Sequence, residues 1–141
     1  PMYVILGPLA GLVSITASCN SVDSVSAIII GIIGCVIAIS TSELLERLET
    51  DDVVGAIPVH LAAGIWGTLA VGLFGASKGF DQFMVQLASV VIVGIFCIIS
   101  TIIITLLVKS IIGLRVSEIE EIEGLDISEH GTGAYADFAM K

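Results

Sequence analysis

The stretch from Ile57 to Gly75 decides the fold and reads I-P-V-H-L-A-A-G-I-W-G-T-L-A-V-G-L-F-G. An apolar run of about 20 residues is the length that crosses a bilayer as an α-helix. The one ionisable side chain within it is His60. Because a titratable group inside a membrane is costly, such a residue is a candidate functional site. The alternative is a structural histidine, hydrogen-bonded in a helix bundle or extended towards the headgroups.

Small residues follow His60 at helical spacing. Gly64, Gly67 and Val71 come after His60 at intervals that place them on the same face of a regular α-helix. Small side chains let a second helix or a permeating molecule approach the backbone closely. We therefore predict that Gly64 and Gly67 are packing positions on the face of the helix that carries His60.

The composition indicates an all-α integral membrane protein. The chain has 141 residues, of which 56% are hydrophobic and 13% are charged. Its mean hydropathy is +1.09. A soluble domain of this size does not need so much apolar surface, because its outside must contact water. The net charge of −9 argues against nucleic acid as a partner.

Enzyme chemistry has no support in the residue pattern. We find no nucleophile–base pair, no phosphate-binding loop and no cluster of metal ligands, so we expect no catalytic residues, no metal and no cofactor. The chain is therefore predicted not to be an enzyme.

Four apolar runs predict about four membrane segments, with a soluble tail after them. We place the segments at about 2–17, 25–42, 53–75 and 83–109, within a membrane region 1–112, and the tail at 113–141. The first run is short for a full span and the chain begins with Pro1. We therefore expect a piece of a longer protein or a processed product. Asp51 and Asp52 precede the third segment, where a carboxylate can cap a helix and complement its dipole.

The distribution of basic residues predicts the orientation. The side of the 43–52 loop and the tail holds Arg47, Lys109, Arg115 and Lys141, whereas the other side holds only Lys78. Cytoplasmic loops carry an excess of Lys and Arg. We therefore expect a multi-pass protein of the plasma membrane whose 43–52 loop and tail are cytoplasmic.

The tail contains strong local signals. Ser117 followed by Glu120 is a capping box, and Gly124 is a natural helix stop, which together predict a short helix over 118–123. The run Ser128-Glu-His-Gly predicts a second cap or turn. The tail is either a solvated acidic segment or, given its many aliphatic residues, a segment that docks on the membrane domain or on a cytosolic partner.

Four motifs together resemble the ammonium transporter family (Amt/Mep/Rh), specifically its C-terminal third. They are G-P-L-A-G-L-V-S-I-T-A at 7–17, D-D-V-V-G-A-I-P-V-H at 51–60, G-I-W-G-T-L-A-V-G-L-F-G at 64–75, and G-L-R-V-S-E-x-E-E-x-E-G-L-D-I-S-E-H-G in the tail from residue 113. The aspartate pair with the following histidine is specific. The tail motif is more specific because a long ordered run of residues rarely matches by chance.

The resemblance implies the C-terminal part of an ammonium-transporter-type helical bundle that works in a homotrimer. In that family two imidazoles line a narrow apolar pore, and His60 matches the second of them. A desolvated neutral imidazole can hydrogen-bond ammonia or relay the proton that ammonium loses on entry. Asp51 and Asp52 match the acidic pair before this helix, for which we expect a capping role. The first pore histidine belongs to upstream helices, so we do not expect this chain alone to conduct ammonium.

The resemblance also implies that the tail is regulatory. In the family this region couples pore activity to the trimer neighbours and, in many members, to a PII-type nitrogen-signalling protein. The matching positions are Gly113, Arg115, Glu120, Glu121, Gly124, Leu125, Asp126 and Tyr135. Two alternative functions stay open, namely an ammonium sensor that signals through the tail, and a truncated membrane protein that binds full-length relatives.

Overall fold

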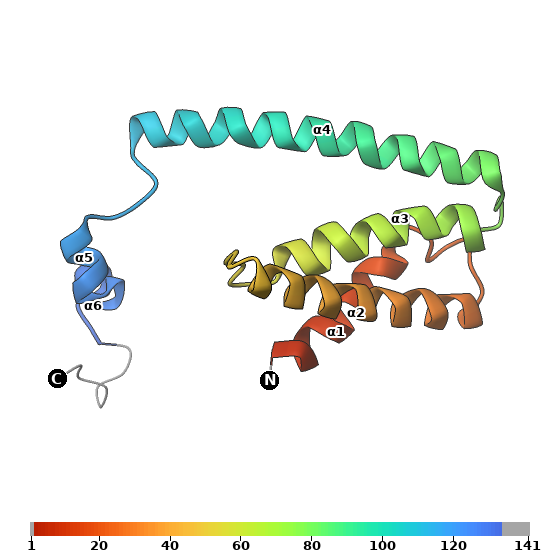
Figure 1. The fold of residues 1–141 in the computed structure, drawn as a ribbon, viewed down its shortest axis with the longest axis horizontal. Coiled ribbons are helices and arrows are strands. Elements are labelled where there is room, and N and C mark those ends of the chain that lie inside the picture. Colours follow the sequence, from red (N-terminus) through yellow and green to blue (C-terminus); the bar gives the residue numbers. More distant parts are fainter. Residues whose placement is uncertain (1, 134–141) are drawn as a thin grey trace. The chain divides into compact units, whose positions relative to one another are not determined.

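The regular structure of the chain is helical, as the sequence predicts. The computed structural model describes residues 2–133, and within them every regular element is a helix (Figure 1). The elements are α1 (Met2–Thr16), α2 (Ser24–Arg47), a π-helical segment η1 (Ile57–Ala62), α3 (Ala63–Phe74), α4 (Phe80–Ile111), α5 (Glu118–Glu123) and α6 (Leu125–His130). The expectation of an all-α fold is therefore confirmed.

Three helical stretches are long and apolar enough to cross a membrane. They are Ser24–Arg47, Ile57–Phe74 and Phe80–Ile111, while the apolar helix Tyr3–Thr16 is shorter. The longest stretch, α4, has 32 residues. At 1.5 Å per residue it extends about 48 Å, whereas the hydrocarbon core of a bilayer is about 30 Å thick. The chain is therefore a multi-pass membrane protein with a helical bundle.

The start of α2 is fixed by Asp23. Its carboxylate accepts hydrogen bonds from the backbone N–H groups of Val25 at 2.9 Å and Ser26 at 3.0 Å. The hydrogen bond from the Ser26 N–H, together with one from the Ser26 hydroxyl, holds the pKa of Asp23 below its ordinary value. The helix then continues to Arg47, further than the end expected near residue 42, and so takes in the first part of the 43–52 loop.

Small residues let α1, α2 and α3 pack closely. Where α1 crosses α2, a Cβ built on Gly11 would lie 3.5 Å from the Gly31 carbonyl oxygen, and one built on Gly7 would lie 2.8 Å from the Cys35 sulfur. The buried apolar cluster of this bundle comprises Leu6, Ala10, Ala38, Val59 and Ala63. Close backbone approach through glycine and alanine is the usual way in which membrane helices associate.

The contacts divide the chain into two compact units, Pro1–Ile95 and Phe96–Lys141. In the first unit, the turn between α3 and α4 is closed by a hydrogen bond of 2.9 Å from the Gly79 N–H to the Gly72 carbonyl. A Cβ on Gly72 would lie 2.5 Å from the Phe83 Cα, so glycine is required there. The second unit contains the end of α4 and the two tail helices.

Candidate functional site

The helix that carries His60 begins with a π-helical turn. The backbone N–H of Ala63 donates to the carbonyl of Pro58, five residues earlier, instead of to residue 59 as in an α-helix. Pro58 has no N–H to donate, so its place in the first turn costs little. Single π-helical turns inside α-helices hold one extra residue and are frequent at functional sites.

Within the π-helical turn, His60 differs in burial from the two residues before it. Pro58 and Val59 are buried and His60 is exposed. The His60 side chain has no hydrogen-bond partner among residues 3–133. The prediction that His60 shares a face with Gly67 is wrong, because Gly67 is buried against α1. A continuous α-helix would place the two positions on one face, and the extra residue of the π-helical turn changes the angle between them.

The two glycines after the π-helical turn both face α1, but at different distances. A Cβ built on Gly67 would lie 2.2 Å from the backbone oxygen of Ser14, which real atoms do not tolerate. A Cβ built on Gly64 would meet only the Val13 side chain, at 3.8 Å, an ordinary contact. Of these two positions, Gly67 is therefore the one where the α1 backbone leaves no room for a Cβ, whereas Gly64 has room for a methyl group.

Ser14 is a residue of this site that the sequence argument missed. It is fully buried, and its hydroxyl donates to the carbonyl of Ala63 over 3.2 Å. A Cβ on Gly34 of α2 would lie 1.9 Å from the Ser14 hydroxyl oxygen, so the two residues are in tight contact. Ser14 therefore lies where α1, α2 and α3 meet. The sequence feature that could have identified Ser14 is its polar side chain within a largely apolar helix.

Trp66 connects α3 to α2. Its indole N–H donates to the carbonyl of Ile30 over 3.0 Å, and its ring packs edge-on against Phe74 with the ring centres 6.5 Å apart. Trp66 is partly buried, and a tryptophan with its ring in the protein interior normally satisfies its N–H in this way. Together with Ser14, it holds the helix of His60 to both of its neighbours.

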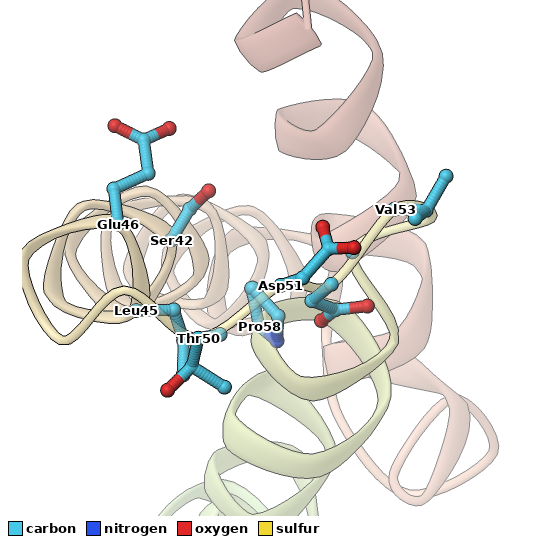
Figure 2. A pocket seen from close by; sticks show the side chains of 9 residues that line it. Ser42, Leu45, Glu46, Thr50, Asp51, Val53 and Pro58 are labelled. Atoms are coloured by element: carbon cyan, nitrogen blue, oxygen red, sulfur yellow. The ribbon is translucent and has the colours of Figure 1, made fainter. Parts of the chain in front are cut away.

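Asp52 caps the start of this helix, and Asp51 does not. The Asp52 carboxylate accepts from the backbone N–H of Ala56 at 2.9 Å and of Ile57 at 2.8 Å. The Asp51 side chain has no hydrogen-bond partner within the described part of the chain. Both aspartates line a pocket of about 260 Å³ between the end of α2 and the loop that precedes η1, where Figure 2 labels Asp51. The pocket is lined by Ser42, Leu45, Glu46, Thr50, Asp51, Asp52, Val53, Gly55 and Pro58.

The difference between the two aspartates gives a first prediction. Asp52→Ala is expected to destabilise the protein by about 0.5–2 kcal/mol, the usual effect of losing a helix cap. Asp51→Ala removes a side chain with no such hydrogen bonds and serves as the matched control, with little expected change. The thermal midpoint of the purified protein in detergent measures both. Equal midpoints for the two variants would contradict the assigned cap.

The tail residues form two short helices in the second unit. Ser117 and Glu120 make the predicted capping box, and α5 ends at Gly124, whose φ of 94° suits glycine. Arg115 forms an ion pair with Glu121. The run Ser128-Glu-His-Gly, predicted as a second cap or turn, contains the C-cap of α6 at Gly131, with a φ of 65°, while Ser128 itself lies inside the helix.

Of the remaining predicted tail residues, Gly113, Leu125 and Asp126 lie within the described part of the chain. Gly113 has a φ of 81°, also in the region that favours glycine. Leu125 and Asp126 lie in the first turn of α6. Tyr135 lies outside the described residues.

The capping box predicts a pH dependence of α5. Hydrogen bonds from the Ser117 hydroxyl at 2.7 Å and the Ser117 N–H at 2.8 Å hold the pKa of Glu120 below its ordinary value. A lowered pKa in the folded state stabilises the helix above the ordinary carboxyl pKa, and this stabilisation is lost as the pH falls through the lowered value. We expect the Cα chemical shifts of α5 to stay helical down to about pH 4.3, the ordinary glutamate pKa, and to lose helicity below it.

Its control is a pair of serine variants. Ser117→Ala removes the hydroxyl but keeps the backbone N–H, so it should raise the NMR titration midpoint of Glu120 part of the way towards its ordinary value, whereas Ser128→Ala should leave it low. A Glu120 midpoint that does not respond to Ser117→Ala would refute the capping explanation.

Comparison with known proteins gives the family. The family model described as "Ammonium Transporter Family" matches residues 1–135. The chain is 38% identical to ammonium transporter Amt2 of Archaeoglobus fulgidus, over 94% of this chain and 32% of that protein. It is 36% identical to ammonium transporter Amt1 of Haloferax mediterranei, over 98% of this chain and 27% of that protein.

The similarity extends to a eukaryotic relative. Putative ammonium transporter 3 of Caenorhabditis elegans is 37% identical over 92% of this chain and 21% of its own length. The chain thus spans a third or less of the length of these curated relatives. With the family model matching nearly its whole length, the chain belongs to the ammonium transporter family.

Proposed function

We propose that the protein takes part in moving ammonium or ammonia across the plasma membrane, with His60 on the path. The observation that carries the proposal is the position of His60, an exposed imidazole without a hydrogen-bond partner in the described chain, on a helix apolar enough to span a membrane. A neutral imidazole has one donor and one acceptor nitrogen, so it can hydrogen-bond ammonia or pass on a proton. The relatives' names support the choice of ammonium as the substrate.

The exposed surface around His60 fits this proposal. Its neighbour Leu61 is an apolar side chain that is 55% exposed. An ionisable group among apolar neighbours is expensive to keep in a membrane unless it faces a cavity or a polar partner. A second pore-lining histidine, implied by the family resemblance, would supply such a partner.

Reconstitution tests the proposal. The full-length protein, including the helices that complete the pore, is reconstituted in liposomes and given an ammonium pulse, and the membrane current and internal pH are recorded. We expect a saturable response to ammonium and none to the same concentration of potassium. A response no larger than that of protein-free liposomes would contradict transport. If ammonium then still changes the conformation of the tail, the sensor function would be the better explanation.

We further propose that the tail is cytoplasmic and regulates the protein within a homotrimer or through a PII-type partner. Its short helices leave aliphatic side chains exposed, with Ile119 at 69%, Ile122 at 72% and Ile127 at 54%. Such exposed side chains on ordered helices favour a docking segment over a purely solvated acidic tail. The basic residues on the same predicted side, among them Arg47 and Arg115, support the orientation.

A further inference from the structure

We propose that the π-helical turn Ile57–Ala62 directs His60 away from the packed side of its helix, and that Ser14 is the positioning residue that holds this turn. The functional consequence rests on the role proposed above for His60. Two features of the molecule support it, namely the burial pattern along the helix and the contacts of the buried Ser14 hydroxyl.

The burial pattern shifts by one residue across the turn. After the turn, Ala63, Gly67 and Ala70 are buried. In a continuous α-helix the positions three and four residues before Ala63 would share this face, and these are His60 and Val59. The buried pair is instead Pro58 and Val59. The shift of one position corresponds to a rotation of about 100°, and it moves His60 out of the helix contact.

Ser14 holds the end of the turn. Its hydroxyl donates to the Ala63 carbonyl over 3.2 Å, and the N–H of the same Ala63 closes the turn on the Pro58 carbonyl. Gly34 and Gly67 both approach Ser14 so closely that neither has room for a Cβ. The hydroxyl is therefore confined by α2 and α3, and its hydrogen bond fixes the position of Ala63 relative to α1.

The opposite end of the turn is held by Asp52, whose carboxylate accepts from the N–H groups of Ala56 and Ile57. One polar side chain thus holds each end of the turn. Because both ends are held, the turn cannot lose its extra residue by shifting along the helix. His60 therefore keeps its exposed position.

Thiol accessibility tests the position of the turn. Single cysteines are placed at Val59 and at His60 in the intact protein, with Cys19, Cys35 and Cys97 replaced by serine. Each is treated with a small water-soluble methanethiosulfonate, and the mass shift is followed over time. We expect Cys at 60 to react about tenfold or more faster than Cys at 59, because reaction requires an exposed thiolate. Similar rates at the two positions would overturn the proposal, since a regular α-helix places both on the packed face.

Removing the hydroxyl tests Ser14. Ser14→Ala is expected to reduce the ratio of the rates at 60 and 59 to about threefold or less, while the oligomer keeps its size. The matched control is Thr16→Val, because the Thr16 hydroxyl is also on α1 but bonds to Leu12 within its own helix. It should leave the ratio unchanged. An unchanged ratio in Ser14→Ala would refute the positioning role.

The two proposals fail separately. The comparison of positions 59 and 60 needs no change at Ser14, so it decides the matter even if Ser14→Ala does not assemble. If the rates differ as expected but His60→Ala still transports ammonium normally, the proposed function is wrong and the turn stands. If His60 is essential but the two rates are alike, the inference about the turn is wrong and the function stands.

Discussion

Replacing His60 with alanine is expected to abolish selective ammonium transport. Alanine removes both the donor and the acceptor that the imidazole presents, and nothing within residues 3–133 replaces them beside the exposed helix face. Positioned groups that transfer protons contribute factors of about 100 or more to rates, so we expect the ammonium-evoked current in proteoliposomes to fall by about that factor. If the imidazole relays the proton, the residual current of the variant should also depend less on the proton gradient than the wild-type current does.

The control for this variant is the exposed neighbour of His60. Leu61→Ala changes an exposed apolar side chain on the same turn and should leave most of the current. Because the His60 side chain is exposed and does not belong to the buried cluster, both variants should assemble like the wild type. A wild-type current in His60→Ala liposomes would exclude His60 from the path, while loss of the oligomer would mean that His60 is structural.

The sequence predicted the helices well because their signals are local. Apolar runs of membrane length and the absence of charge within them require helices. The start of α5 was predictable because Ser117 and Glu120 lie within one turn of each other and bond reciprocally. The end at Gly124 followed from the tolerance of glycine for a positive φ.

The π-helical turn was not predictable, because it depends on contacts between distant residues. Its hydrogen bond from Ala63 to Pro58 differs by one residue from an α-helical bond, and no side-chain pattern distinguishes the two. Ser14, which lies 49 residues from Ala63, has the sequence signature of an ordinary membrane serine bonded to its own helix. The helix could therefore be predicted from the sequence, but the direction in which His60 points from it could not, because that direction depends on the π-helical turn.

Replacing Gly67 with alanine is expected to prevent α1 and α3 from packing. The new Cβ would lie 2.2 Å from the oxygen of Ser14 and 2.8 Å from its Cα. Both atoms belong to backbone, which cannot rotate away as a side chain would, so the two helices must separate. Overpacking of a filled core costs about 1–3 kcal/mol and sometimes more. We expect most of the protein to be lost from the membrane fraction, or the thermal midpoint to fall sharply.

Gly64→Ala is the matched control, because it makes the same chemical change one helical turn earlier on the same helix. The nearest atom to its new Cβ is a methyl of Val13 at 3.8 Å, so the added group fits. Alanine also favours the helix over glycine by about 1 kcal/mol, so this variant should be at least as stable as the wild type. Fluorescence-detected size exclusion of the two variants in detergent gives the comparison. If both glycines tolerate alanine equally, α1 and α3 do not meet at Ser14. That result would also contradict the hydrogen bond from Ser14 to Ala63, which requires the same close contact.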